Sequence, residues 1–406
     1  MRLGMLLAAG ACLLLAAHAR AAEERGTTML KPEEFAILPW GTTPGDREQL
    51  EQIKACGFNL AGFVRPDDLD LVAQVGLQCL VIDGSTHVGD AEAALEDAEV
   101  TRRVEALVKR VGNHPAVYGY YLRDEPSAHA YEGLGRWAAA FAKAAPKALP
   151  YINLFPNYAS PAQMAVPTYD QYLEDFVQKV KPRFISYDHY ALMDDGTLRH
   201  GYFQNLEAVR KAALRHNLPF WNIVLANAHF HYAEPSDGGL RFQAYTTLAY
   251  GARGISYFTY FAPHVGNYRL APIDQFGNKT VTWEMLRNVN LQIQKLGPTY
   301  IQLKSVNVFH HPNVPEGCVG LDTSRFLAEV TGGDLLVGEF EGPEGRPYVM
   351  VVNKDLHRST PFGVRFKEAG PIMMVSAYTG QAQGWGGEQS WLAPGQGMLL
   401  FLGRQQ

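Results

Sequence analysis

The feature that most constrains the fold is an alternation of short apolar segments with longer amphipathic ones, repeated eight times between residues 30 and 300. The short segments cover residues 35–40, 58–64, 77–83, 117–123, 150–155, 184–190, 220–226 and 254–261. Because they are apolar nearly throughout, they are expected to be buried on both faces, which is typical of parallel strands. Eight such units predict the α/β class and a (β/α)8 TIM barrel over residues 30–300.

The segments between these strands have the spacing of helices. In residues 97–111, for example, Val100, Val104, Leu107, Val108 and Val111 recur at three- and four-residue intervals and form one apolar stripe. A helix after each strand is what a parallel barrel requires, since it must carry the chain back to the start of the next strand.

The pattern changes after the predicted barrel. Short strand-like segments at 335–339, 348–353, 372–378 and 398–402 are separated by turns rich in Gly, Pro and Asn. They predict a small antiparallel β-sandwich over residues 304–403. A chain of 406 residues has room for both domains.

The first 22 residues have the composition of a signal peptide. Arg2 precedes an apolar run at 3–17, and Ala19-Arg20-Ala21 matches a small-residue cleavage site. A secreted or periplasmic protein is therefore expected, with a lipoprotein anchored through Cys12 as the alternative. No later segment is long and apolar enough to span a bilayer, so stable membrane insertion is not expected.

Charge and cysteine content narrow the choice of partners. Lys and Arg number 36 against 41 Asp and Glu, a net charge of −5, which offers no basic field for nucleic acid. Without the leader the cysteines are Cys56, Cys79 and Cys318, an odd number that does not suggest a disulfide framework. Nothing in the sequence indicates the oligomeric state.

Barrel enzymes place their sites at the carboxyl ends of the strands, so the polar and aromatic residues that follow each apolar segment are the candidates. They are Trp40, Arg65, Asp83, Asp124, Glu125, Asn157, Asp188, His189, Tyr190, Asn227, His229 and Tyr260. Aromatic faces pack on sugar C–H surfaces, while carboxylates and amides bind hydroxyl groups, so this set favours a carbohydrate. The histidines lack the spacing of a zinc site, and no metal is predicted.

Residues 114–126, His-Pro-Ala-Val-Tyr-Gly-Tyr-Tyr-Leu-Arg-Asp-Glu-Pro, resemble the fourth-strand signature of retaining TIM-barrel glycoside hydrolases. By that resemblance Glu125 falls on the acid/base glutamate, whereas Asp124 stands where the family usually has Asn. The alternative for Asp124-Glu125-Pro126 is an ordinary helix start with an Asp cap. The resemblance does not identify one specific family.

The resemblance departs from the family pattern at the seventh strand. Those families carry a nucleophilic Glu there, but residues 223–231 contain no acid. Asp188, at the end of the sixth strand, is the preferred second carboxylate. Glu234, Asp124 and Asp83 are alternatives, and so is the absence of a catalytic partner.

The sequence therefore predicts a secreted glycoside hydrolase that cleaves an oligo- or polysaccharide with two carboxyl groups and no cofactor. Glu125 and Asp188 are the predicted catalytic pair, and the other ten candidates are predicted to bind substrate. A sugar-binding barrel without hydrolytic activity is one alternative. A barrel hydrolase or lyase acting on another bond, with a metal held by Asp83, Asp188 and His229, is the other.

Overall fold

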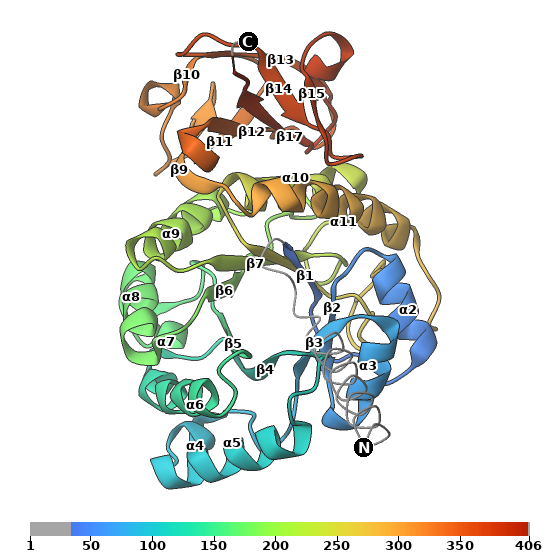
Figure 1. Cartoon of the computed structure of the whole chain (residues 1–406), viewed down its shortest axis with the longest axis vertical. Helices are drawn as coiled ribbons and strands as arrows, with labels where there is room; N and C mark the ends of the chain where they lie inside the picture. Colours follow the sequence, from blue (N-terminus) through green and yellow to red (C-terminus); the bar gives the residue numbers. More distant parts are fainter. Residues whose placement is uncertain (1–33, 405–406) are drawn as a thin grey trace, which may run out of the picture.

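The computed structural model describes residues 34–404, and its first part is a nearly closed barrel of eight parallel strands (Figure 1). The hydrogen-bonded order is β1-β8-β7-β6-β5-β4-β3-β2, and a parallel bridge between Thr42 and Phe63 links the two ends. The strands are β1 (Ala36–Pro39), β2 (Leu60–Val64), β3 (Gln78–Val81), β4 (Val117–Asp124), β5 (Leu149–Leu154), β6 (Ile185–Asp188), β7 (Phe220–Leu225) and β8 (Gly254–Phe258). The predicted barrel is confirmed.

Helices surround the barrel and join successive strands (Figure 1). They are α2 (Arg47–Ala55), α3 (Leu69–Val75), α4 (Asp90–Ala93), α5 (Asp97–Val111), α6 (Tyr131–Ala144), α7 (Pro161–Met164), α8 (Tyr169–Val180), α9 (Tyr202–Arg215), α10 (Asp237–Ala249) and α11 (Val281–Tyr300). Short 3-10 turns are η1 (Pro66–Asp68), η2 (Ala128–Ala130), η3 (Leu321–Thr323), η4 (Pro343–Gly345) and η5 (Gly387–Ser390). Side-chain caps begin several helices, as Thr168 does for α8 and Ser236 for α10.

Large aromatic side chains fill the inside of the barrel. Inward-facing residues of alternate positions form one cluster that includes Trp40, Tyr121, Tyr151, Phe184 and Trp221. A separate and larger cluster lies between the strands and the helices. The interior is therefore a packed core, and any ligand must bind above it, at the carboxyl ends of the strands.

The second part of the chain forms two antiparallel sheets. One has the order β15-β14-β17-β12-β11-β9 and the other β10-β13-β16. Their strands are β9 (Lys304–His311), β10 (Leu327–Gly332), β11 (Leu335–Glu341), β12 (Pro347–Asn353), β13 (Thr360–Phe366), β14 (Ile372–Val375), β15 (Ala382–Gly384), β16 (Trp391–Leu392) and β17 (Gly397–Leu402). Apolar residues of both sheets share one core, as the β-sandwich prediction requires.

The larger sheet also packs on the barrel, beside α10 and α11 (Figure 1). Along β11, Leu335 and Val337 face the smaller sheet, whereas Leu336 and Phe340 join the core of the barrel. Gly338 permits the closest approach, because a Cβ there would lie 2.0 Å from the carbonyl oxygen of Ala249 at the end of α10. The sheet is thus buried on both faces, which ties the two parts together.

Two further properties bear on the predictions. Over residues 34–404 the structure contains no helix long and apolar enough to cross a membrane. Cys56, Cys79 and Cys318 are free thiols. The predicted leader, residues 1–22, lies outside the described residues.

Candidate active site

Three acidic side chains and one amide come together where β4, β5 and β6 end. Asp124 is the last residue of β4 and Glu125 follows it, while Asp188 is the last residue of β6. Asn153 lies between them on β5, paired in register with Asp124. The group stands at the carboxyl ends of barrel strands, the position at which barrel enzymes carry their chemistry.

A β-bulge in β4 decides which side chains of this strand face inward. Tyr121 pairs with Tyr151, but the next pairs are Arg123 with Ile152 and Asp124 with Asn153, so one extra residue is inserted. The insertion reverses the alternation, because successive side chains of a strand point to opposite faces. Asp124 consequently shares the inward face with Asn153.

Arg123 is turned outward by the same bulge. Its guanidinium donates to Asp90 at 2.6 Å and to the carbonyl oxygen of Val88 at 3.2 Å, both outside the barrel. The cation is therefore held away from the three acids and does not neutralise them.

Glu125 has an uncommon backbone conformation. Its φ is +43°, and its N–H donates to the carbonyl oxygen of Asn153 at 2.9 Å. A left-handed conformation costs a residue with a Cβ about 1–2 kcal/mol. Non-glycine residues in such conformations cluster at functional sites, and this one turns the side chain of Glu125 toward Asp188.

Glu125 and Asp188 form a carboxyl pair. Their side chains lie within hydrogen-bonding distance, and only 4% of Asp188 is exposed. The pKa of Glu125 rises from 4.5 to about 7, because burial disfavours the charged form and Asp124 adds a like charge, against the hydrogen bond with Asp188. Burial, and then the charges of Glu125 and Asp124, hold the pKa of Asp188 well above its usual range. Two buried carboxyls in contact resist double ionisation, so the pair retains one proton near neutral pH.

Asn153 fixes two of the acids at once. Its Nδ2 donates to Oδ1 of Asp124 at 3.0 Å and to Oδ1 of Asp188 at 2.9 Å. Its Oδ1 accepts from the hydroxyl of Ser186 at 2.9 Å, and Ser186 lies 2.7 Å from the hydroxyl of Tyr151. The chain of hydrogen bonds sets the orientation of the amide, so that Asn153 offers donors only to the carboxylates.

Asp124 is the acid most open to solvent. Its side chain is exposed, yet surrounding protein atoms raise its pKa by desolvation, with the hydrogen bond from Asn153 acting in the opposite direction. An accessible carboxylate that is still partly desolvated is typical of a recessed site rather than of a flat surface. Asp124 is thus available to a ligand, whereas Asp188 is covered.

Aromatic rings surround the acids. The pKa of Tyr121 is raised by burial and then by Asp124, and that of Tyr190 by burial and then by Asp188, which places both rings near the carboxylates. Trp40 lies against Tyr121 with ring centroids 6.0 Å apart, and Tyr190 stacks on Phe258 at 5.4 Å. Trp40 and Tyr190, both predicted from the sequence, are therefore at the site.

Three other predicted binding residues lie away from the acids. Arg65 is exposed and pairs with Asp68. Asp83 accepts hydrogen bonds from Ser85 and from Arg110 of α5, on the helix side of β3. Asn157 donates to the carbonyl oxygen of Gly201 at 3.0 Å, beside α9. The structure does not bring these side chains to the carboxylates.

Tyr260 and His189 are enclosed rather than available to a sugar. Tyr260 is 1% exposed and accepts a hydrogen bond from Nε1 of Trp283 at 2.9 Å, in the layer between the barrel and α11. His189 is 0% exposed, with Nδ1 2.9 Å from Oδ1 of Asn205 on α9, and burial lowers its pKa to about 3. The prediction of sugar contacts by these two residues requires correction, because alternation turns His189 outward when Asp188 faces inward.

Asn227 and His229 form a buried polar pair after β7. Nδ1 of His229 lies 3.0 Å from Oδ1 of Asn227, whose Nδ2 donates to Thr259. His229 also stacks on Tyr268 with centroids 4.6 Å apart, and burial lowers its pKa to about 4. The neutral imidazole supports Tyr190 from behind, at a centroid distance of 6.0 Å.

Sequence reasoning missed Asn153 and Arg199. Asn153 is the one amide in an apolar strand and shares the parity of Tyr151, which was a usable signal. Arg199, in the loop before α9, lies over the rings of Tyr158 and Tyr232 at 4.3 and 5.2 Å and donates to the carbonyl oxygen of Tyr190. No local pattern in the sequence marks Arg199, because its position depends on how that loop folds.

The alternative acid Glu234 is engaged elsewhere. Its carboxylate accepts from Arg269 at 2.7 Å, and 56% of its side chain is exposed. No group of three or more His, Cys, Asp or Glu within residues 34–404 is arranged to hold a metal ion. The acids of this site therefore have to be understood through proton chemistry.

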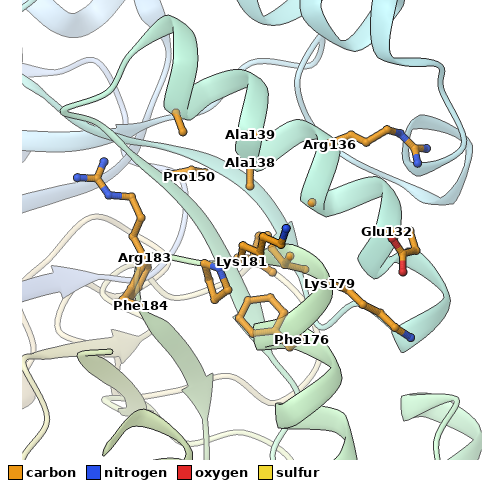
Figure 2. Close-up of a pocket in the computed structure, with 15 residues that line it drawn as sticks. Glu132, Arg136, Ala138, Ala139, Pro150, Phe176, Lys179, Lys181, Arg183 and Phe184 are labelled. Carbon is orange, nitrogen blue, oxygen red and sulfur yellow. The ribbon is translucent and has the colours of Figure 1, made fainter. Parts of the chain in front are cut away.

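A separate hollow of about 320 Å³ lies between α6, α8 and the starts of β5 and β6. Figure 2 shows Pro150 and Phe176 at this hollow, with Arg136, Lys179 and Arg183 extending from its edges. Because it borders the amino-terminal ends of the strands, it is remote from the end at which barrel sites are built. Its residues make no contribution to the acid cluster.

The structure is similar to those of TIM-barrel glycoside hydrolases. A β-galactosidase from Bacillus circulans sp. alkalophilus superposes with a TM-score of 0.64 at 8% identity, over 91% of this chain and 99% of that one. A glycoside hydrolase family 5 protein from Bacteroides vulgatus gives 0.57 at 12% identity, over 91% and 89%. A β-galactosidase from the psychrophilic Marinomonas ef1 gives 0.51 at 12% identity, and this chain covers 62% of its length. No protein-family model matches the sequence, and no curated protein matches it.

Proposed function

We propose that this chain is a glycoside hydrolase in which Glu125 is the general acid. The observation that carries the proposal is the pairing of Glu125 with Asp188, which keeps a proton on a carboxyl group near neutral pH at the carboxyl end of the barrel. Glycosidic cleavage needs such a group to protonate the leaving oxygen. The accessible Asp124 and the rings of Trp40 and Tyr190 suit a sugar ring above it.

Asp188 has a different place in this scheme from the one its strand position first suggested. Carboxyl groups that act on opposite sides of a sugar are about 5–5.5 Å apart in retaining enzymes and roughly 6.5–9.5 Å apart in inverting ones. A carboxyl in contact with Glu125 and 4% exposed does not leave room for a sugar between them. We therefore assign Asp188 to holding the proton of Glu125, and Asp124 to the substrate.

The test is a panel of 4-nitrophenyl glycosides and oligosaccharides, with the anomer of the first product followed by NMR. Wild type is expected to hydrolyse at least one member, and Glu125→Gln to lose activity by about 10²–10⁴-fold while remaining folded. The exposed Glu105 of α5 provides the control, Glu105→Gln, which removes the same charge outside the site. Wild-type rates in Glu125→Gln would refute the assignment.

One observation favours a second candidate function, sugar binding without turnover. Residues 223–231, which run from β7 into the following loop, carry no acid. If calorimetry shows that oligosaccharides bind while no product forms, and Glu125→Gln binds equally well, the barrel is a binding protein.

Export is a further part of the proposal. The apolar run at 3–17 and Ala19-Arg20-Ala21 support a cleaved signal peptide. Expression of the full chain in a bacterial host, followed by fractionation and mass determination of the mature amino terminus, tests it. A protein retained in the cytoplasm with residues 1–22 intact would contradict export.

A further inference from the structure

We infer that the site acts on 2-acetamido-2-deoxy sugars, and that the substrate's own acetamido oxygen is the nucleophile while Asp124 holds the amide N–H. This inference rests on the proposed glycosidase function. It adds the substrate class and gives the accessible acid a defined role.

The first step of the argument concerns the missing protein nucleophile. A retaining mechanism needs a group that attacks the anomeric carbon from the face opposite the leaving group. Asp188 is covered and paired with Glu125, Glu234 is bound by Arg269, and residues 223–231 contain no acid. Of the acids placed at this end of the barrel, only Asp124 is open to a ligand.

The second step concerns how Asp124 and Glu125 are placed relative to each other. They are consecutive residues, and the bulge of β4 together with the φ of +43° at Glu125 turns both toward the site. In a 2-acetamido sugar, the leaving oxygen and the amide nitrogen are attached to adjacent carbons. Two carboxyl groups on adjacent residues therefore match two polar atoms on adjacent carbons, one protonating and one accepting.

Asp124 is held as an acceptor. Nδ2 of Asn153 donates to its Oδ1 at 3.0 Å, which leaves Oδ2 for the N–H of the substrate. An amide whose N–H is bound by a carboxylate has a more electron-rich carbonyl oxygen, so the same contact orients the acetamido group and activates it. Asn153 accordingly serves as a positioning residue.

The reaction balances without any other reagent. The acetamido oxygen forms a bond to C1 as the bond from C1 to the leaving oxygen breaks, Glu125 gives its proton to that oxygen, and the amide proton moves to Asp124. Water then attacks C1, Glu125 takes the proton of the water, the bond from C1 to the acetamido oxygen breaks, and Asp124 returns the amide proton. Retained configuration results from the two displacements.

The surroundings suit the methyl of an acetamido group. Trp40 and Tyr121 are 8% and 7% exposed, and Phe63 packs on both, with ring centroids 4.8 Å from Trp40 and 4.3 Å from Tyr121. These rings form an apolar floor beside the carboxylates. A hydroxyl at C2 would leave that floor without a partner, whereas a methyl can be buried against it.

The experiment uses the wild-type protein and matched 4-nitrophenyl glycosides that differ only at C2, with a hydroxyl or an acetamido group, in both the gluco and galacto series. The acetamido compounds are expected to be hydrolysed at least about 100-fold faster in kcat/KM, with retention. Fluorine substitution of the acetyl methyl weakens the carbonyl nucleophile, so kcat should fall progressively from acetyl to trifluoroacetyl. This series needs no variant and is independent of folding.

Asp124→Asn should lower kcat on the acetamido glycoside by about 10²-fold or more and abolish inhibition by a 1,2-fused thiazoline analogue of the cyclised intermediate. Asp90→Asn, which removes a carboxylate bound by Arg123 outside the barrel, is the matched control. Equal rates on hydroxyl and acetamido substrates, or no effect of fluorination, would overturn the inference while leaving the glycosidase function intact. No turnover of any glycoside would instead overturn the proposed function itself.

Discussion

Replacement of Glu125 by Gln should stabilise the folded protein at alkaline pH and leave its stability nearly unchanged at acidic pH. The pKa of Glu125 is raised from 4.5 to about 7 by burial and by Asp124. Below pH 4.5 the carboxyl is protonated in both the folded and the unfolded chain, so its ionisation has no effect on stability. Between pH 4.5 and 7 the unfolded chain ionises while the folded chain resists, and stability is lost as the pH rises.

The magnitude follows from the pKa difference. One pKa unit corresponds to about 1.36 kcal/mol, so a rise from 4.5 to about 7 costs the wild-type fold about 3 kcal/mol once Glu125 is ionised. Gln has no charge to bury and avoids this cost. Its presence also removes a like charge from Asp188, which acts in the same direction.

Urea unfolding of wild type, Glu125→Gln and Glu105→Gln at pH 4.5, 6 and 8 measures the effect. The free energy of unfolding of Glu125→Gln should exceed that of wild type by about 3 kcal/mol at pH 8 and by less than about 0.5 kcal/mol at pH 4.5. Glu105→Gln should follow the wild type at all three values. A difference between Glu125→Gln and wild type that does not change with pH would refute the protonated carboxyl pair.

Four further results are expected. The kcat/KM of wild type should fall above about pH 7 as Glu125 loses its proton, which a pH–rate profile on an activated aryl glycoside would show and a flat profile to pH 9 would contradict. Asn153→Ala should lower kcat by about 10- to 100-fold and move this alkaline limb upward, because the hydrogen bond from Asn153 lowers the pKa of Asp188; an unmoved limb would mean a structural role alone. Tyr260→Phe should lower the free energy of unfolding by about 1–3 kcal/mol through loss of the acceptor for Trp283, with kcat/KM kept within about twofold, and a large loss of activity would place Tyr260 at the site after all. Glu234→Gln should retain wild-type kcat on the same substrate, since Arg269 already binds that carboxylate, and inactivation would restore Glu234 as the second catalytic acid.

The bulge in β4 shows how a site can depend on one residue of register. By simple alternation from Tyr121, Arg123 would face inward and Asp124 outward. The inserted residue reverses this, sending Arg123 to Asp90 and Asp124 to Asn153. A cation among the three acids would have held them ionised, so the register decides whether Glu125 keeps a proton.

Part of this protein was determined by sequence alone. Eight apolar segments of strand length, each followed by an amphipathic helix, require a sheet buried on both faces, and a closed parallel barrel meets that requirement. The same reasoning located the ends of the strands and hence Glu125, Asp124 and Asp188. In the second domain it found β11, β12, β14 and β17, which are strongly apolar because the barrel and the smaller sheet cover their two faces.

Only the tertiary structure decided the rest. The strands β10, β13 and β15 have exposed polar positions and weak hydrophobic patterns, so they become strands through pairing with distant neighbours rather than through composition. Whether Asp188 or His189 faces the cavity, and whether Tyr260 lies at the site or against Trp283, depends on inward or outward direction, which a strand pattern does not report when both faces are buried. The contact between Glu125 and Asp188, and the amide of Asn153 that joins two acids from different strands, arise because the closed barrel brings residues far apart in the chain to one end.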